Sequence, residues 1–187
     1  AQYAYRFKDK AKRFKMPSKI LLALKDLEAY RERMVKVKGM LQKAIGELFE
    51  EKLTTGFIQD SSKAMIKEFD KTIAIIEEKV MTLMNEDEEL KRVYNLAISV
   101  KGIGMQTAVF MLIHTHGFTT FTTSRQFACY CGIAPFEHTS GTSVRGNTRV
   151  SHLANKKLKS LLHMCARSAV RYEPELKAYY ERKVADG

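Results

Sequence analysis

Two runs of mainly apolar residues, each repeating in alternating steps of three and four, constrain the fold of this chain more than any other feature. Such a repeat places its members on one stripe of an α-helix, which must pack against another helix. The runs are Ile20, Leu24, Leu27, Arg31, Met34, Lys38, Leu41, Ile45 and Leu48, and Ile66, Phe69, Ile73, Ile76, Val80, Leu83, Asp87, Leu90, Tyr94 and Ala97. They predict an arm of two long antiparallel helices over residues 18–98, each roughly 45–50 Å long.

The segment that joins the two runs is predicted to be the turn of the arm, at residues 54–62. Gly56 suits a helix C-cap, and Asp60 or Ser61 suits an N-cap. The apolar stripe is wider than one helical hairpin needs, and two arrangements stay open. The arm either packs against the arm of another subunit, giving a homo-oligomer, or packs only on itself.

The pattern changes after the arm to short helices. They are predicted at residues 105–115, 123–131 and about 153–172, with a last helical turn after Pro174. Residues 118–121 are the only stretch with β character. Residues 1–15 are predicted to be a short basic helix or an unpaired tail. The expected fold class is mainly α: a long helical hairpin followed by a small helical domain, residues 99–187.

The net charge of +11 is concentrated at the two ends of the chain. Residues 1–19 contribute +6 and residues 101–187 contribute +7, whereas residues 20–98 carry a charge of −2. Seven Lys and Arg residues but no Asp or Glu lie between Ser140 and Arg171. Such a run is typical of a surface that binds a polyanion, and Lys156, Lys157 and Lys159 are its candidate nucleic-acid contacts.

Several other classes of protein and site are disfavoured. The longest apolar runs are too short to span a membrane, and no apolar segment follows the basic N-terminus as in a secretory signal. We therefore expect a cytoplasmic protein whose three cysteines are reduced thiols. Cys129 and Cys131 lack the spacing and the second ligand pair of a zinc site, so we expect no metal site in this chain.

Two glycines around one apolar residue, Gly102-Ile103-Gly104, separate a helix end from a helix start. The pattern resembles a helix-hairpin-helix motif, in which the glycines allow a tight turn and free backbone N–H groups face a phosphate. Lys101, Gly102, Gly104 and Gln106 are then candidate nucleic-acid contacts, and Ile103 anchors the turn in the core. The alternative is an ordinary corner between two helices with a glycine cap.

Residues 135–149 are predicted to be a loop that presents a nucleophilic serine. A serine that attacks a phosphodiester needs an exposed oxygen and nearby cations for the charge that develops on phosphorus. Ser140 is the better candidate, because Gly141 lets a nucleic-acid backbone come close, and Ser143 is the second candidate. Arg145 and Arg149 could clamp the phosphate in bidentate fashion. His138 or His152 could carry a proton. The alternative is an ordinary polar turn.

These motifs together resemble, in order and spacing, the C-terminal domain of the insertion-sequence-110-type transposases, also called DEDD or bridge-RNA-guided recombinases. The resemblance covers about residues 90–175. Its residues are Gly102-Ile103-Gly104, Cys131-Gly132-Ile133-Ala134-Pro135, Ser140-Gly141, Gly146-x-x-Arg149-Val150-Ser151 and Asn155-Lys156-x-Leu158-Lys159. The arm resembles the coiled-coil linker of that family, and residues 1–17 resemble the end of its RuvC-like N-terminal domain.

The resemblance implies a DNA transposase that cleaves and rejoins strands as an oligomer guided by a structured RNA. By resemblance, Ser140 is the nucleophile, and it acts with carboxylates of the N-terminal domain that hold Mg²⁺. No such carboxylate set is identifiable in this sequence. We therefore expect these 187 residues alone to bind nucleic acid weakly but not to recombine it. The alternative from another class is a non-catalytic helix-hairpin-helix module that binds DNA and dimerises through its arm.

Overall fold

The computed structural model describes residues 2–8, 16–47, 55–140 and 144–186. The described residues are mainly helical, with one small two-stranded sheet, so the expected fold class is confirmed. The first element is a short helix, α1 (Gln2–Arg6), in the basic N-terminal segment where a short helix was one of two expectations.

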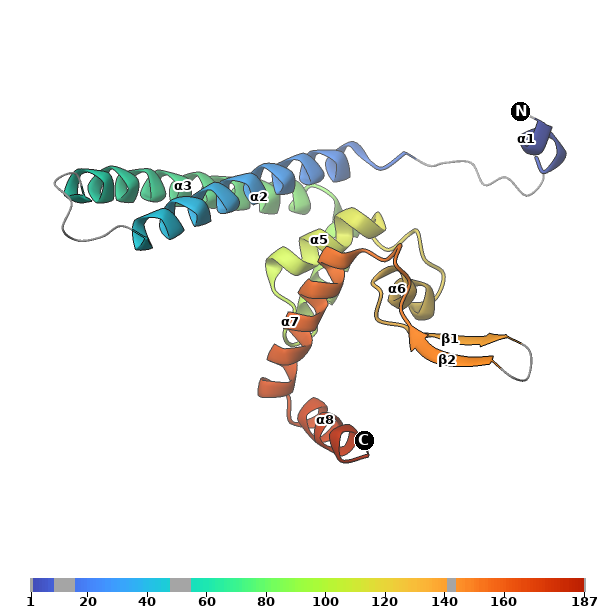
Figure 1. Cartoon of the computed structure of the whole chain (residues 1–187). Coiled ribbons are helices and arrows are strands. Elements are labelled where there is room, and N and C mark those ends of the chain that lie inside the picture. The colour runs from blue at the N-terminus through green and yellow to red at the C-terminus, as the bar shows by residue number, and fades with distance from the viewer. Residues whose placement is uncertain (1, 9–15, 48–54, 141–143, 187) are drawn as a thin grey trace.

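The predicted arm is present as two long helices side by side, α2 (Lys19–Gly46) and α3 (Thr55–Asn85) (Figure 1). Ser18 caps the start of α2, because its hydroxyl oxygen accepts a hydrogen bond from the backbone N–H of Leu21 at 3.2 Å. Leu24 of α2 and Met84 of α3 are completely buried between the helices. The stripe packs where the heptad pattern predicts.

The two cations that interrupt the first heptad stripe are matched by carboxylates of the facing helix. Arg31 Nε lies 2.7 Å from Glu77 Oε1, and Lys38 Nζ pairs with Asp70. Both pairs are only partly exposed to solvent. The cations therefore fit the seam because α3 supplies opposite charge at the same level of the arm.

The prediction of an interhelical turn at residues 54–62 was wrong for its described part, because α3 already begins at Thr55 and includes Gly56, Asp60 and Ser61. A glycine inside a helix costs only about 1 kcal/mol, and an acidic residue near a helix N-terminus is favoured by the helix dipole. Residues 48–54 lie outside the described residues. The local cap signals therefore did not stop the helix.

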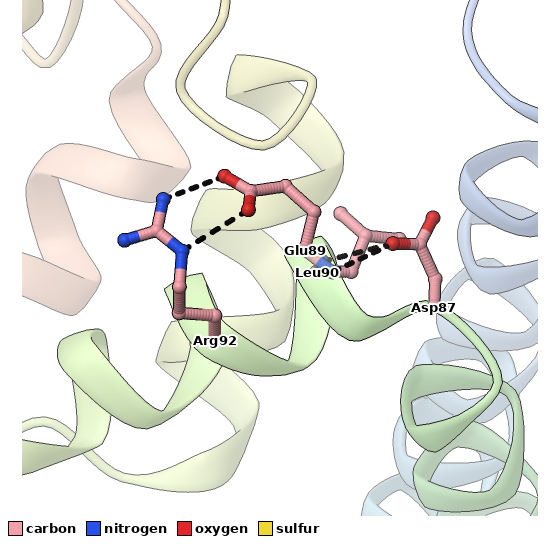
Figure 2. A network of polar contacts seen from close by, with 4 residues as sticks. All are labelled: Asp87, Glu89, Leu90 and Arg92. Carbon is pink, nitrogen blue, oxygen red and sulfur yellow. Dashed lines mark hydrogen bonds and ion pairs between the residues drawn. The ribbon is translucent and has the colours of Figure 1, made fainter.

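The second run was also predicted to form one helix through Ala97, and this too was wrong. Asp87 has an extended backbone, and its Oδ1 atom accepts hydrogen bonds from the N–H groups of Glu89 and Leu90, each at 3.1 Å (Figure 2). A new helix, α4 (Glu88–Ser99), starts there. Asp87 thus caps a helix instead of occupying the stripe, and Leu90, Tyr94 and Ala97 are buried on the new helix.

One hydrophobic core joins the base of the arm to the helical domain. It contains residues of α2, α3, α4 and α5 (Met105–Thr115), among them Leu24, Met84, Tyr94 and Leu112. A smaller cluster around Phe110 and Leu158 joins α5 to α7 (Lys156–Tyr172). The position of α7, which carries the basic residues, is therefore fixed to the arm through α5.

Of the two remaining helices, α6 (Ser124–Tyr130) follows the sequence pattern closely, whereas α8 (Pro174–Ala185) is longer than the single turn expected after Pro174.

The prediction of β character at residues 118–121 was wrong. Gly117 and Phe118 have positive φ angles of 66° and 62° in a turn after α5, and the Thr120 hydroxyl donates to the Thr115 carbonyl. These threonines close the helix end instead of pairing strands.

The predicted loop at residues 135–149 instead contains a β-hairpin, which was not expected. Strand β1 (Phe136–Ser140) pairs antiparallel with β2 (Val144–Arg149), with a register irregularity between Phe136 and His138. Its β-branched members Thr139, Val144 and Thr148 favour extended backbone. The strands project away from the helices of the domain (Figure 1).

Candidate nucleic-acid interface

The glycine turn between α4 and α5 holds helices together. Gly102 has a φ of +94°, and a Cβ atom there would lie 2.5 Å from the carbonyl oxygen of Cys165 on α7. Only glycine allows so close an approach of the two backbones. Ile103 is partly buried against both hydrophobic clusters, as predicted. Gly102 therefore positions α7, and that helix occupies the space where a side chain would lie.

The other three residues predicted around this turn differ in what surrounds them. Lys101 Nζ lies 3.0 Å from Glu173 Oε2, and Gln106 Nε2 donates to Glu77 Oε1 at 2.9 Å. Gly104 is the exposed N-cap of α5, and nothing lies within 4 Å of a Cβ atom built on it. Gly104 and the exposed side chain of Lys101 are thus the positions of the four that are open to a ligand.

The register of the β-hairpin places the backbone of Arg145 within one position of Ser140 and places Arg149 at the far end. The backbone of Ser140 pairs with Val144, and Arg145 pairs with Thr139 in the next position. Arg149 pairs with Phe136 at the other end of the hairpin, roughly 13 Å along the strand from Ser140 at ~3.3 Å per residue. Ser143 and the side chains of His138, Ser140 and Arg145 lie outside the described part.

A furrow runs from the base of this hairpin along one face of α7 to α8. It consists of three adjoining hollows of about 570, 460 and 500 Å³. The first two share Lys156 and Lys159, and the last two share His163 and Ala166. We call this surface the α7 furrow. Its basic side chains and imidazoles, all exposed, are Arg149, His152, Lys156, Lys159, His163 and Arg167.

The electrostatics of the α7 furrow suit a polyanion. Within the described surroundings, no Asp or Glu lines any of its three hollows. From Lys156 to Val170 the furrow follows α7 for about 21 Å at 1.5 Å per residue, which corresponds to about six nucleotide steps of one DNA strand at 3.4 Å each. A nucleic-acid strand lying there would meet cations along its whole length.

The sequence prediction found only part of this surface. It included Arg149, Lys156 and Lys159 but not His163 or Arg167 as nucleic-acid contacts. A signal was available, because positions 156, 159, 163 and 167 are spaced by three and four and so lie on one face of a helix. Tyr180 of α8, which lines the last hollow, carried no such signal, because it comes from another helix.

Lys157, the third predicted lysine, faces the arm. Its Nζ atom lies 2.5 Å from Glu32 Oε2 of α2 and 4.5 Å from the centre of the Phe110 ring. The Arg31–Glu77 pair and Gln106 lie at the same junction of arm and domain. We call these five polar residues, with the buried Glu28, the junction cluster. Lys157 therefore stabilises the position of α7.

Burial governs the pKa values at this junction. Desolvation raises the pKa of Glu28 above its ordinary value, although the charges of Arg31 and Lys157 oppose the shift. Desolvation, followed by the charges of Lys157 and Lys25, lowers the pKa of His114. In the domain core, burial raises the pKa of the Cys131 thiol to about 11. Cys131 is therefore a neutral thiol at physiological pH.

The described residues contain no cluster of three or more His, Cys, Asp or Glu side chains able to bind a metal ion. None of the helices in the described ranges combines the length and apolar character needed to cross a bilayer.

Comparison with known proteins gives a consistent group. A model of the Transposase IS116/IS110/IS902 family matches residues 94–181. The insertion element IS110 uncharacterized 43.6 kDa protein of Streptomyces coelicolor is 33% identical over 89 residues, which are 48% of this chain and 22% of that protein. The pilin gene-inverting protein of Moraxella bovis is 23% identical over 148 residues, 79% of this chain and 43% of that protein.

The pilin gene-inverting protein of Moraxella lacunata matches over the same lengths and at the same identity. The chain thus spans less than half the length of the curated relatives it matches. The Moraxella alignments are longer than the matched domain and so include part of the arm. The glycine turn, the β-hairpin and the α7 furrow all lie in residues 94–181, the part of the chain that matches the Transposase IS116/IS110/IS902 family model.

Proposed function

We propose that this chain is the arm and the DNA-binding, strand-cleaving domain of a transposase that moves an insertion sequence. The α7 furrow carries this proposal, because its row of cations without carboxylates fits a phosphate backbone. The relatives support it by name, since one belongs to an insertion element and two invert a pilin gene. Inverting or moving a DNA segment requires strand cleavage and rejoining.

Ser140 is the proposed nucleophile, and Ser143 is the second candidate. In this step the serine oxygen forms a bond to phosphorus while the bond from phosphorus to a deoxyribose oxygen breaks. The hydroxyl proton passes to a base, and the departing sugar oxygen takes up a proton. Attack by another sugar hydroxyl on the phosphoserine ester rejoins the strand and frees the serine. Arg145, whose backbone pairs with Thr139 one position from Ser140, is the cation proposed to stabilise the charge that develops on phosphorus.

The metal-binding part of this machinery is proposed on the resemblance alone. Carboxylates of a RuvC-like domain, whose end residues 1–17 would form, would hold Mg²⁺. The metal would stabilise charge on the transferring phosphate. A structured guide RNA is proposed on the resemblance alone. Homo-oligomerisation through the arm is supported by exposed apolar side chains, among them Met40, Met65 and Ile75.

Covalent trapping tests the proposed nucleophile. Full-length protein, guide RNA, Mg²⁺ and labelled DNA are mixed, and protein–DNA adducts are separated on a denaturing gel. We expect the adduct to disappear in Ser140→Ala and to persist in Ser143→Ala, the matched control three residues further along the chain. An adduct that persists in Ser140→Ala would exclude that serine, and its loss in Ser143→Ala alone would assign the role to Ser143.

A non-catalytic DNA-binding and dimerisation module is the second candidate function. It is favoured by the separation of Arg149 from Ser140 along the hairpin, which leaves the predicted phosphate clamp incomplete within this chain. This candidate predicts salt-dependent DNA binding with no covalent adduct in any variant. The same trapping experiment therefore separates the two functions.

A further inference from the structure

The last hollow of the α7 furrow differs in chemistry from the other two. It has a volume of about 500 Å³ and lies between α7 and α8. His163, Ala166, Arg167 and Val170 line it from α7, and Tyr180 lines it from α8. Cationic or hydrogen-bonding groups, an apolar floor and an aromatic ring therefore meet in one cavity at the end of a basic furrow.

Tyr180 is the residue that a backbone-binding surface does not need. Its side chain is 54% exposed, although it belongs to a hollow whose other walls are aliphatic or basic. The neighbouring Tyr179 is equally exposed but lies outside the hollow, and Arg182 sits 5.4 Å from the centre of its ring. The two tyrosines thus form a natural pair, one in the cavity and one outside it.

The hollow has the features of a nucleotide site. An aromatic ring beside basic residues is how proteins hold unpaired bases, because every base has a flat face that stacks. In an intact duplex those faces are covered by neighbouring base pairs, so the ring would have no partner there. The volume falls within the range of small-ligand pockets. Arg167 and His163 would meet the phosphate while Ala166 and Val170 contact the base.

We propose that the α7–α8 hollow binds one unpaired nucleotide of a strand whose backbone lies in the α7 furrow, with the base stacked on Tyr180. The proposal rests on the proposed function in one respect only, that a nucleic acid occupies the furrow. The unpaired nucleotide can belong to DNA or to RNA, since both offer the same base face and phosphate.

Binding of tailed and blunt DNA tests the hollow. Full-length protein is titrated with a blunt duplex and with the same duplex carrying a three-nucleotide overhang whose first base is 2-aminopurine. We expect the overhang to tighten binding by about fivefold to 150-fold, the range of one base stacked on an aromatic ring. We also expect the 2-aminopurine fluorescence to be quenched on binding. An overhang of RNA with the same sequence shows which kind of strand depends more on Tyr180.

The variants separate stacking from folding. Tyr180→Ala should remove the preference for the overhang and the quenching, whereas Tyr180→Phe should keep both. Tyr179→Ala is the control for loss of an exposed ring on the same helix and should behave as the wild type. Equal affinity for the two duplexes, or a preference that survives Tyr180→Ala, would overturn the proposed nucleotide site but not DNA binding by the α7 furrow. Failure to bind either duplex would contradict nucleic-acid binding by the α7 furrow, and with it the proposed function.

Discussion

The two faces of α7 carry the same kind of residue but use it differently. Lys157 faces the arm and is paired with Glu32, whereas Lys156 and Lys159, its neighbours in sequence, line the α7 furrow. Successive helical residues point about 100° apart, so one lysine cluster divides between an internal contact and an open surface. A basic run in a sequence therefore overstates the charge available to a ligand until the helix is oriented.

The arm accounts for this difference. The arm carries a net charge of only −2, but three of its glutamates, Glu28, Glu32 and Glu77, lie at the junction with the domain. Glu32 and Glu77 bind Lys157 and Gln106, two of the residues predicted to contact nucleic acid. The carboxylates hold the inner face of α7 and the start of α5, while the outer face of α7 stays basic.

The largest effect is expected from charge changes on the face of α7 that lines the α7 furrow, compared with a change on the face toward the arm. Reversing two charges with Lys156→Glu and Lys159→Glu should weaken DNA binding by about 100-fold near physiological salt and flatten its salt dependence, because two phosphate contacts become repulsive. Lys157→Met, on the junction side, should leave the salt dependence unchanged. Fluorescence anisotropy at several salt concentrations measures both. A similar loss of slope in Lys157→Met would show that the two faces are not distinct.

The helices, including much of α7, could be predicted because their apolar residues follow the helical period. Met105–Thr115 was predicted to the residue, and α7 differed only at its start, where Asn155 accepts a hydrogen bond from the Leu158 N–H. The break at Asp87 was missed because Asp87 falls in register with the heptad. The capping signal, Asp followed by two glutamates, was present but competed with a longer pattern.

The candidate site was less predictable, because it depends on contacts distant in sequence. Glu32 lies 125 residues from Lys157, and nothing local to either residue indicates their pairing. The hairpin was missed because glycine, serine and threonine at residues 139–148 suit both a loop and a twisted two-stranded ribbon. Once the hairpin forms, its register decides that Arg149 and Ser140 lie at opposite ends.

A second prediction concerns the packing that orients α7. Gly102→Ala should destabilise the fold by about 2 kcal/mol, because the new Cβ would collide with the Cys165 carbonyl and alanine is strained at positive φ. Gly104→Ala is the matched control: its Cβ meets open space, so only the weaker N-cap preference of alanine counts, and it should cost less than about 1 kcal/mol. Urea denaturation measures both free energies. Equal stabilities would contradict the close approach of the turn to α7.

A third prediction compares the two cations of the arm. Arg31→Met should cost about 1–2 kcal/mol, because Glu77 loses a 2.7 Å partner near the buried Glu28. Lys38→Met, whose partner Asp70 is about half exposed, should cost less than about 0.5 kcal/mol. Thermal unfolding ranks the two variants. If Lys38→Met were the more damaging, the junction cluster would not be the place where arm and domain are held together.

The smallest expected effect is the pH dependence of the junction cluster. The pKa of Glu28 in the folded state lies above its ordinary value of 4.5. Between these two pKa values the folded state binds more protons than the unfolded state, so the stability of the fold falls as pH rises through this range. His114 acts in the opposite direction: its folded pKa lies below 6.5, so stability falls as pH drops below that value. Glu28→Gln should remove the first slope and His114→Gln the second, both read from urea midpoints between pH 4 and pH 8. The Glu28→Gln variant keeps the charged neighbours of that residue, which are Arg31, Lys157, Glu32 and Glu77. An unchanged slope in this variant would show that one of these neighbours, and not the buried carboxyl, causes the pH dependence.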